Sequence, residues 1–243
     1  MKTKISIVIG GSKGIGKSIS NELKKRGDKV FILSRSVKNN KTNIKTDITQ
    51  KEELKAKIFE KIKKNKIDNI IFSQRYRGSS EKELYNTDLF SIENLINLVD
   101  KKLNYRASII FISSISNRTI LDDQPLNYHI IRSSIEQMMK FYATKFLKKQ
   151  IRFNCVLPSK IIKPTNKSFF YKNKRGKKIR ELIEFVTPLK RMGTSNDVAK
   201  IIKFLTSNES EYITGQSFIV DGGLHLLSQE SVINILKKNK KLF

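Results

Sequence analysis

The feature that most constrains this chain is a glycine-rich segment that directly follows a short apolar run. The run covers residues 4–9, Lys-Ile-Ser-Ile-Val-Ile, and the segment is Gly10-Gly11-Ser12-Lys13-Gly14-Ile15-Gly16-Lys17-Ser18. A β-branched run, a cluster of glycines and a helical pattern from about residue 14 predict a strand, a tight turn and a helix. Backbone N–H groups at the start of such a helix favour phosphate. We therefore expect a nucleotide to bind here.

The same turn fits two phosphate-binding patterns. Counted from Gly11 it is G-x-x-x-x-G-K-S, typical of nucleotide triphosphatases, and counted from Gly10 it is G-x-x-x-G-x-G, typical of dinucleotide binding. A triphosphatase needs an acidic residue after a later strand to organise magnesium. The apolar runs that end at Phe72 and Ile112 are followed by serines instead. The missing carboxylate favours a dinucleotide.

Short β-branched runs alternate with helical patterns along the rest of the chain, which predicts βαβ units and a parallel sheet. The expected fold class is therefore α/β, with a single Rossmann-type doubly wound parallel sheet and helices on both faces. Residues 1–243 form one domain in this interpretation. The expected strands cover residues 4–9, 30–33, 69–72, 108–112, 151–157 and 217–220, and the expected helices cover residues 14–25, 50–64, 83–103 and 126–148.

Composition restricts the class of protein further. The chain has 243 residues, of which 38% are apolar, enough for the core of one large domain. No apolar run approaches the roughly 20 residues that span a bilayer. One cysteine, Cys155, excludes an intramolecular disulfide, and two histidines leave little for a metal site. We expect a cytoplasmic protein without a metal ion or a membrane span.

The chain is strongly basic, with 49 Lys and Arg against 22 Asp and Glu and a formal net charge of +27. Such a charge points to nucleic acid, an anionic membrane or an acidic partner. The basic residues are spread along the whole chain, however, which also fits a lysine-rich composition without a binding role. Nucleic-acid binding is kept as the alternative from a different functional class.

Later landmarks resemble, in order, the motifs of the short-chain dehydrogenase/reductase family over about residues 4–223. Any one of these motifs is weak, but their combination in this order is specific. The nearest resemblance is to 3-oxoacyl-carrier-protein reductases. The matching stretches are Gly10, Gly14 and Gly16, Asp47, Ile112-Ser113-Ser114, Tyr128, Asn154 to Pro158, Arg191-Met192-Gly193, Asp197-Val198-Ala199, Tyr212 to Gln216, and Val220 to Gly223.

The resemblance implies a redox reaction between a carbonyl and an alcohol with a nicotinamide cofactor. Ser114 would polarise the carbonyl and Tyr128, fourteen residues later, would donate the proton. Asp47 matches the aspartate that contacts adenine. The remaining residues expected around the cofactor are Gly10, Ser12, Lys13, Gly14, Ile15, Gly16 and Ser73.

The choice of cofactor is predicted from charge. A carboxylate at the end of the second strand would bind the ribose hydroxyls and repel a 2′-phosphate. This position holds Ser34, and Arg35 follows it, while Lys13 precedes Gly14 in the glycine turn. Two cations without a carboxylate favour NADP(H) over NAD(H).

Two departures from the family pattern concern the catalytic group. Tyr128-His129-Ile130-Ile131-Arg132 places arginine where the family has the lysine that supports the tyrosine and binds the nicotinamide ribose. Arginine supplies charge and hydrogen bonds but does not give up a proton. The family's asparagine aligns with Asp88, or in a second register with Asn86. Asp88 either opposes the support that Arg132 gives to Tyr128 or pairs with Arg132 across the site.

These departures leave two interpretations of function. One is an active reductase that uses Ser114, Tyr128, Arg132 and Asp88, and the other is a cofactor-binding member with weak or no turnover. A third departure replaces the stretch after the fourth strand by Phe72-Ser73-Gln74-Arg75, followed by Tyr76-Arg77-Gly78. Gln74, Arg75 and Arg77 reach a cofactor phosphate or an anionic substrate, or else the loop is simply repacked.

Two basic segments complete the expectations. Residues 163–180 carry eight Lys and Arg, no acid, and the aromatic run Phe169-Phe170-Tyr171, at the place where the family has its substrate lid. We expect this lid to grip an anionic substrate, such as an acyl thioester on coenzyme A or a carrier protein, a nucleotide sugar or an acidic sugar. Residues 228–243 form an amphipathic helix with a basic tail. By resemblance, residues 218–223 help to form a homodimer or homotetramer.

Overall fold

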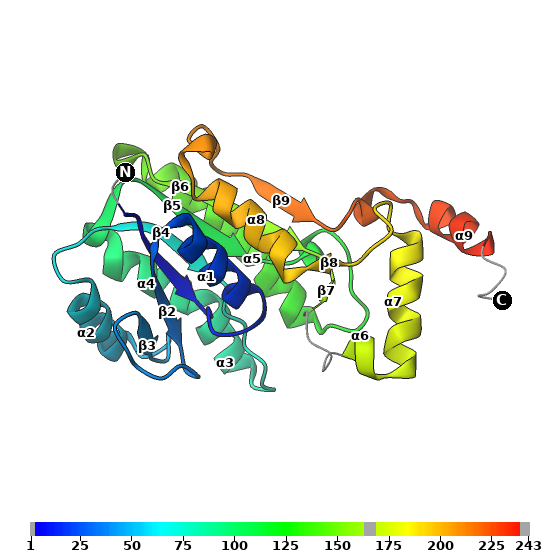
Figure 1. The fold of residues 1–243 in the computed structure, drawn as a ribbon, viewed down its shortest axis with the longest axis horizontal. Coiled ribbons are helices and arrows are strands. Elements are labelled where there is room, and N and C mark those ends of the chain that lie inside the picture. The colour runs from blue at the N-terminus through cyan, green and yellow to red at the C-terminus, as the bar shows by residue number, and fades with distance from the viewer. Residues whose placement is uncertain (1–2, 163–168, 239–243) are drawn as a thin grey trace.

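The computed structural model describes residues 3–162 and 169–238 and contains a seven-stranded sheet in which every pair is parallel. Its strand order is β3-β2-β1-β4-β5-β6-β9 (Figure 1). Two short strands, β7 and β8, form a separate parallel pair. The strands are β1 Ile5–Ile9, β2 Lys29–Ser34, β3 Asn43–Lys45, β4 Ile67–Phe72, β5 Leu103–Ile112, β6 Arg152–Pro158, β7 Ile161–Ile162, β8 Gly193–Thr194 and β9 Ser217–Val220.

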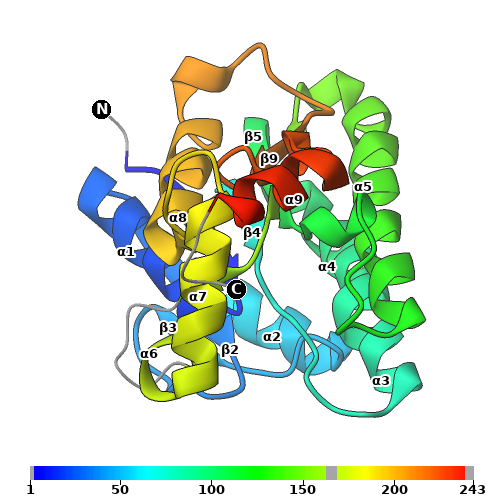
Figure 2. The same cartoon turned by 90° about the vertical axis from the view of Figure 1, so that its right-hand side faces the viewer.

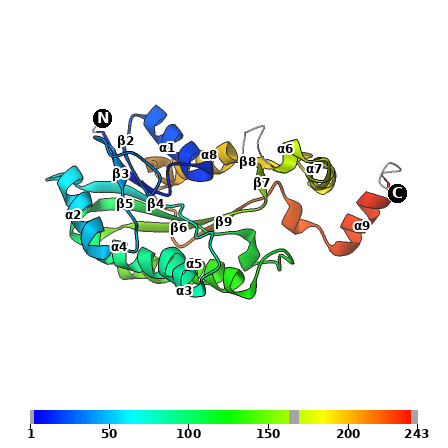
Figure 3. The ribbon, with the colours of Figure 1, turned by 90° about the horizontal axis from the view of Figure 1, so that it is seen from below.

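Helices cover both faces of the sheet, as expected for a doubly wound fold. Helices α1 and α8 lie on one face, and α2, α4 and α5 lie on the other (Figure 3). In Figure 2, α7 and α9 lie at the front, beside one another. The helices are α1 Gly14–Arg26, α2 Lys51–Ile62, α3 Glu81–Tyr85, α4 Ser91–Val99, α5 Leu126–Lys145, α6 Phe169–Lys172, α7 Lys174–Val186, α8 Ser195–Leu205 and α9 Gln229–Lys237.

The strand β1 shows why the sequence has continuous apolar runs rather than alternating ones. Successive side chains of a strand point to opposite faces of the sheet. Ile7 and Ile9 therefore join the core beneath α2, α4 and α5, while Val8 joins the core beneath α1 and α8. Both faces are covered, so the strand is apolar except at Ser6, whose buried hydroxyl is hydrogen-bonded.

The order of the strands places the site. From β1 the chain moves outward to β2 and β3, and it then crosses back to β4 and continues through β5, β6 and β9 on the other side. The loops after β1 and β4 thus leave the sheet in opposite directions. Ligands of such sheets bind at this switch point, beyond the carboxyl ends of the strands. Gly10 and Ser73 are the first residues after these two strands.

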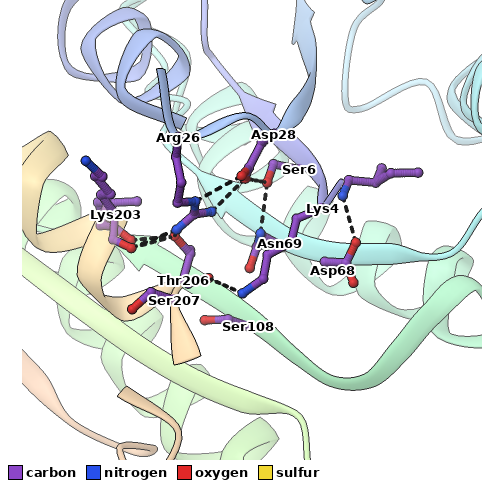
Figure 4. A network of polar contacts seen from close by, with 12 residues as sticks. Lys4, Ser6, Arg26, Asp28, Asp68, Asn69, Ser108, Lys203, Thr206 and Ser207 are labelled. Atoms are coloured by element: carbon purple, nitrogen blue, oxygen red, sulfur yellow. Dashed lines mark hydrogen bonds and ion pairs between the residues drawn. The ribbon is translucent and has the colours of Figure 1, made fainter. Parts of the chain in front are cut away.

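A polar network closes the opposite end of the sheet (Figure 4). Arg26, at the end of α1, binds both carboxylate oxygens of Asp28 and also the hydroxyl of Thr206. The Ser6 hydroxyl donates to Asp28 and accepts from the Asn69 amide. Because these buried groups are hydrogen-bonded to one another, the network joins α1, β1, β4 and the end of α8 and offsets part of the cost of removing its charges from water.

The expected helix over residues 83–103 is wrong in detail. The segment is divided into α3, a π-helical stretch over Asn86–Phe90, α4 and a 3-10 turn over Asp100–Lys102. Strand β5 begins at Leu103, five residues earlier than expected, and it has a register irregularity opposite β4. The π-helical stretch matters for function, because such stretches are frequent at functional sites. It contains Asp88.

Other elements were missed or only partly described. Strand β3 has three residues, too few for a clear sequence pattern, and α8 begins with a capping box formed by Thr194 and Asp197. The helix α9 confirms the expected amphipathic segment, while residues 239–243 of its basic tail lie outside the described residues. In the part that is described, no helix combines the length and the apolar character needed to cross a bilayer.

Candidate active site

A cavity of about 1210 Å³ lies beyond the carboxyl ends of the parallel strands. The loops after β1, β2, β4 and β5 line it, together with α5 and the segment after β6. It thus brings together residues that are far apart in the sequence. Of the predicted site residues, those that line the cavity are Gly10, Lys13, Gly14, Ile15, Gly16, Arg35, Asp47, Ser73, Ser114, Tyr128 and Arg132. Ser12 and Asp88 are not among the lining residues.

The glycine turn forms a tight cradle. Gly10 and Gly14 have φ angles of +75° and +54°, where L side chains are strained. A Cβ atom on Gly16 would lie 2.4 Å from the Gly10 carbonyl oxygen and 2.6 Å from the Ser73 hydroxyl. No side chain caps the first N–H groups of α1. These groups and the helix dipole therefore remain available to an anion such as a pyrophosphate.

Three serine hydroxyls meet at the end of β2. The Ser12 hydroxyl lies 2.9 Å from that of Ser34 and 3.1 Å from that of Ser36. Ser12 itself does not line the cavity, but it contacts Ser34 and Ser36, which do. Arg35 is exposed, and its guanidinium lies 3.7 Å from the Asp47 carboxylate. Hydroxyls and a cation, without a carboxylate on β2 itself, therefore surround this end of the cavity.

Ser114 and Tyr128 lie where β5 and α5 meet. The Ser114 hydroxyl oxygen accepts the N–H of Ser116 at 3.2 Å, so its own O–H is free to donate. The hydroxyl of Ser113 donates to the carbonyl of Arg132 at 2.7 Å and fixes α5 against the end of β5. Sequence reasoning assigned no role to Ser113. Its position inside the Ser-Ser pair after a strand was the available signal.

Arg132 and Asp88 form a buried ion pair. An Arg132 Nη atom lies 2.5 Å from Asp88 Oδ2, and the two side chains are 4% and 0% exposed. The other carboxylate oxygen of Asp88 accepts the N–H of Tyr76 at 2.7 Å. The predicted pairing across the site is therefore confirmed. Burial raises the pKa of Asp88, and the charge of Arg132 and the Tyr76 N–H oppose that shift.

The altered loop after β4 brings a second guanidinium to Tyr128. The Cζ atom of Arg75 lies 4.7 Å from the centre of the Tyr128 ring, and that of Arg132 lies 5.0 Å from it. One Nη atom of Arg75 donates to the side-chain oxygen of Gln124 at 3.0 Å. Arg75 thus contacts the tyrosine, and Gln74, Arg75 and Arg77 all line the cavity. The sequence analysis named Arg75 as a contact of a cofactor phosphate or an anionic substrate. It did not predict the contact with Tyr128, because no local pattern relates the two residues.

The described part of the lid, residues 169–180, contributes apolar side chains to the cavity. Phe169, Phe170 and Ile179 line it, together with Ile183 further along α7. None of the lysines and arginines in this described part lines the cavity, and Lys163 and Lys167 lie outside the described residues. The expected grip of lid cations on a substrate inside the cavity is therefore not what residues 169–180 offer, and a grip on a carrier outside the cavity stays a prediction. One side of α7 is apolar, and its cations lie on the other side.

Sequence reasoning also missed the pair of His225 with Asp221, whose Nδ1 and Oδ2 atoms lie 2.8 Å apart. The Val-Asp-Gly-Gly stretch was the only signal for it. The cavity is nevertheless cationic, because elements other than the lid supply positive charge. The cations that line the cavity are Lys13, Arg35, Arg75, Arg77, Arg132, Lys160 and Arg191.

Comparison with known proteins agrees with this geometry. Residues 10–225 match the family described as Enoyl-(Acyl carrier protein) reductase. The match covers most of the chain, and the chain belongs to the short-chain dehydrogenase/reductase family of oxidoreductases. Members of this family bind nicotinamide cofactors.

Three similar proteins illustrate the relationship. The 3-oxoacyl-acyl-carrier-protein reductase of Buchnera aphidicola is 27% identical, over 93% of this chain and 100% of that protein. The glucose 1-dehydrogenase of Gluconobacter oxydans is 26% identical, over 90% and 91%. A short-chain dehydrogenase from Leptospira borgpetersenii, solved with bound NAD+, has a TM-score of 0.76 and 25% identity, with 92% of this chain and 93% of that chain covered. These names differ in substrate, so the substrate must be argued from the site.

Proposed function

We propose that this protein is an NADP(H)-dependent oxidoreductase that interconverts a carbonyl and an alcohol. The observation that carries the proposal is that one cavity contains the glycine cradle, the cations Lys13 and Arg35 at one end, and Ser114 with Tyr128 deeper inside. A cavity with convergent polar groups is the default site for such a ligand.

The residues present fit a dinucleotide. The absence of a side chain at Gly16 lets α1 pack closely against Gly10 and Ser73, and the uncapped N–H groups at the start of α1 suit a pyrophosphate. Arg132 Nε is buried and has no hydrogen-bond partner among the described residues, and it suits a ribose hydroxyl. When bound, the nicotinamide supplies or accepts a hydride at the substrate carbon. Asp47 holds the adenine end.

The preference for NADP(H) rests on the charges around the end of β2. Ser34 and Ser36 supply hydroxyls, and Arg35 and Lys13 supply positive charge, to a 2′-phosphate. Guanidinium–phosphate contacts are charge-assisted and stronger than neutral hydrogen bonds. Asp47 competes for Arg35 at 3.7 Å, but the pair is solvent-exposed and weak.

The catalytic roles follow from which atoms are free. The Ser114 O–H donates a hydrogen bond to the substrate oxygen and holds it beside Tyr128. Tyr128 Oη gives its proton to that oxygen during reduction and takes it back during oxidation. Arg132 orients α5 and the ribose, and Asp88 holds Arg132 in place.

The substrate class follows from the rest of the cavity. Arg77 offers positive charge, Lys160 shares its charge with Asp123 at 3.2 Å, and Phe169, Phe170 and Ile183 offer an apolar wall. An acyl thioester fits this combination, and a nucleotide sugar or an acidic sugar fits it in part. The substrate is thus an anionic small molecule or a carrier-bound acyl group. We further propose one domain over residues 1–243, a homodimer or homotetramer, and a cytoplasmic location.

The first test is a titration of the protein with NADPH and, in parallel, NADH, followed by the fluorescence of the nicotinamide. The chain contains no tryptophan, so the cofactor itself must report binding. We expect micromolar affinity for NADPH and clearly weaker affinity for NADH. Equal affinities would overturn the cofactor assignment, and a lack of binding to either would overturn the proposed function. A screen with 3-oxoacyl thioesters and sugars then tests turnover.

The second candidate, a cofactor-binding protein with weak or no turnover, is favoured by one observation. Asp88 neutralises Arg132, which occupies the place of the lysine that supports the tyrosine. The variant Arg132→Lys separates the two candidates once a substrate is in hand. A large gain in turnover would mean that arginine limits proton transfer, and an unchanged rate would mean that it is an adequate substitute.

A further inference from the structure

Two guanidinium groups, those of Arg75 and Arg132, lie over the ring of Tyr128, but they differ in how far their charges are neutralised by neighbours. Arg132 is the cation on the same helix, but its charge is cancelled at contact distance by Asp88 in a site where water is excluded. A charge paired in this way exerts little net field on a third group beyond the pair. The cation at the family's lysine position is therefore unable to do by itself what a free lysine does.

Arg75 is in the opposite situation. Its guanidinium lies over the Tyr128 ring at 4.7 Å, and within the described ranges no carboxylate lies within ion-pair distance of it. Its hydrogen-bond partner is the neutral amide of Gln124. The charge of Asp88 acts on Arg75 through space, but the carboxylate is bonded to Arg132, so most of the positive charge of Arg75 stays available to the tyrosine. Desolvation lowers the pKa of Arg75, and the charge of Tyr128 acts in the opposite direction, which reflects their proximity.

The position of Arg75 is itself fixed by Asp88. The carboxylate of Asp88 binds Arg132 through Oδ2 and the N–H of Tyr76, the residue after Arg75, through Oδ1. One buried side chain therefore neutralises the first cation and holds the backbone that carries the second. Asp88 lies in the π-helical stretch over residues 86–90.

We propose that Arg75, rather than Arg132, is the cation that stabilises the ionised form of Tyr128. This inference rests on the proposed function, in which Tyr128 exchanges a proton with the substrate. Arg75 acts through Tyr128 and is a positioning residue. It replaces the charge of the family's lysine from a different element, the loop after β4, while Arg132 keeps the structural and ribose-binding part of that role. The titratable and charged groups around Tyr128 are Arg75 and Arg77 on the loop after β4, Asp88, Asp123 with Lys160, and His129 and Arg132 on α5.

Tyrosinate absorbance tests this inference without any substrate. The chain has seven tyrosines and no tryptophan, so the ultraviolet band of tyrosinate is not obscured. Subtracting the titration of Tyr128→Phe from that of the intact protein isolates Tyr128. The same subtraction is made in the backgrounds Arg75→Gln, Arg75→Lys and Arg77→Gln. Circular dichroism at each pH confirms that every variant remains folded.

We expect Arg75→Gln to move the midpoint of Tyr128 ionisation to higher pH, because it removes the positive charge that lies over the ring. Arg75→Lys should keep most of the wild-type midpoint, since it keeps the charge. Arg77→Gln is the matched control, because it removes the same charge from the same loop without touching the ring. Its effect should be much smaller.

Two results would overturn the inference. They are an unchanged midpoint in Arg75→Gln and an equal shift in Arg77→Gln. The titration needs neither cofactor nor turnover. An absence of NADPH binding or of redox activity would therefore contradict the proposed function while leaving this measurement intact.

Discussion

Arg132 and Asp88 form an ion pair, 2.5 Å between Nη and Oδ2, that is almost completely shielded from solvent. The two residues occupy the positions where the resemblance to the family places a lysine and an asparagine. Arginine keeps the positive charge of the lysine, whereas aspartate adds a negative charge that would be unfavourable in this buried site without a counter-charge. As a pair they keep the site neutral at that point and leave Arg75 as the unpaired cation above Tyr128.

The first prediction concerns the stability of this pair. The substitution Asp88→Asn leaves Arg132 buried without a counter-charge, and we expect it to lower the free energy of unfolding by about 3–5 kcal/mol. Asp100→Asn is the control, because it breaks the half-exposed pair with Lys149 and should cost about 1 kcal/mol or less. Urea unfolding measures both. Similar losses in the two variants would contradict the prediction.

The second prediction concerns the glycine cradle. In Gly16→Ala the new methyl group meets the Gly10 carbonyl at 2.4 Å, so either the turn opens or Ser73 moves. We expect NADPH binding to fall below detection in the fluorescence titration. Gly27→Ala, at the other end of α1, is strained at φ +100° but has open space around its Cβ. It should lower the melting temperature and leave NADPH affinity unchanged.

The third prediction concerns acid stability. Hydrogen bonds from Arg191 hold the pKa of Asp197 well below its usual range, and Asp197 also closes the capping box of α8. A carboxyl whose pKa is depressed by folding stabilises the fold above its unfolded pKa of about 3.9, and this contribution is lost as the pH falls below that value. Asp197→Asn should cost about 1 kcal/mol at neutral pH. Below about pH 4 the gap to the wild type should shrink.

Thermal unfolding at a series of pH values measures that convergence. Asp122→Asn serves as the control, because Asp122 is exposed and forms no ion pair among residues 3–162 and 169–238. It should leave the pH dependence unchanged. A gap between Asp197→Asn and the wild type that stays constant with pH would show that the carboxylate of Asp197 does not carry the effect.

The fourth prediction concerns cofactor selectivity. Removal of the guanidinium in Arg35→Ala should weaken NADPH binding by about tenfold or more and leave NADH binding nearly unchanged, since a hydrogen bond to a charged group contributes about 1.5–3 kcal/mol. Lys38→Ala removes a charge from the same exposed loop but does not line the cavity. Equal losses in the two variants, or an equal loss for both cofactors, would mean that only general electrostatic attraction is involved.

Much of the fold is determined by local patterns in the sequence. Continuous apolar runs identify strands that are buried on both faces, and the periodic stretches between them identify the crossover helices. The glycines at positions 10, 14 and 16 define the turn, because only glycine fits its backbone angles and its close contacts. The resemblance to the family named Ser114 and Tyr128 as candidates, and both line the cavity. These features depend on neighbours along the chain, so the sequence contains the information directly.

The charges that control the site were decided only by the tertiary structure. The sequence left the pairing of Asp88 with Arg132 as one of two alternatives, and only the structure shows the pair, with Asp88 in a π-helical stretch. The contact of Arg75 with Tyr128 has no signal in the sequence. The sequence predicted that lid cations bind an anionic substrate, whereas in the structure Phe170 of α6 and Ile179 of α7 line the cavity. Groups that are distant in the sequence and adjacent in space determine whether a charged side chain is paired, unpaired or directed away from the cavity.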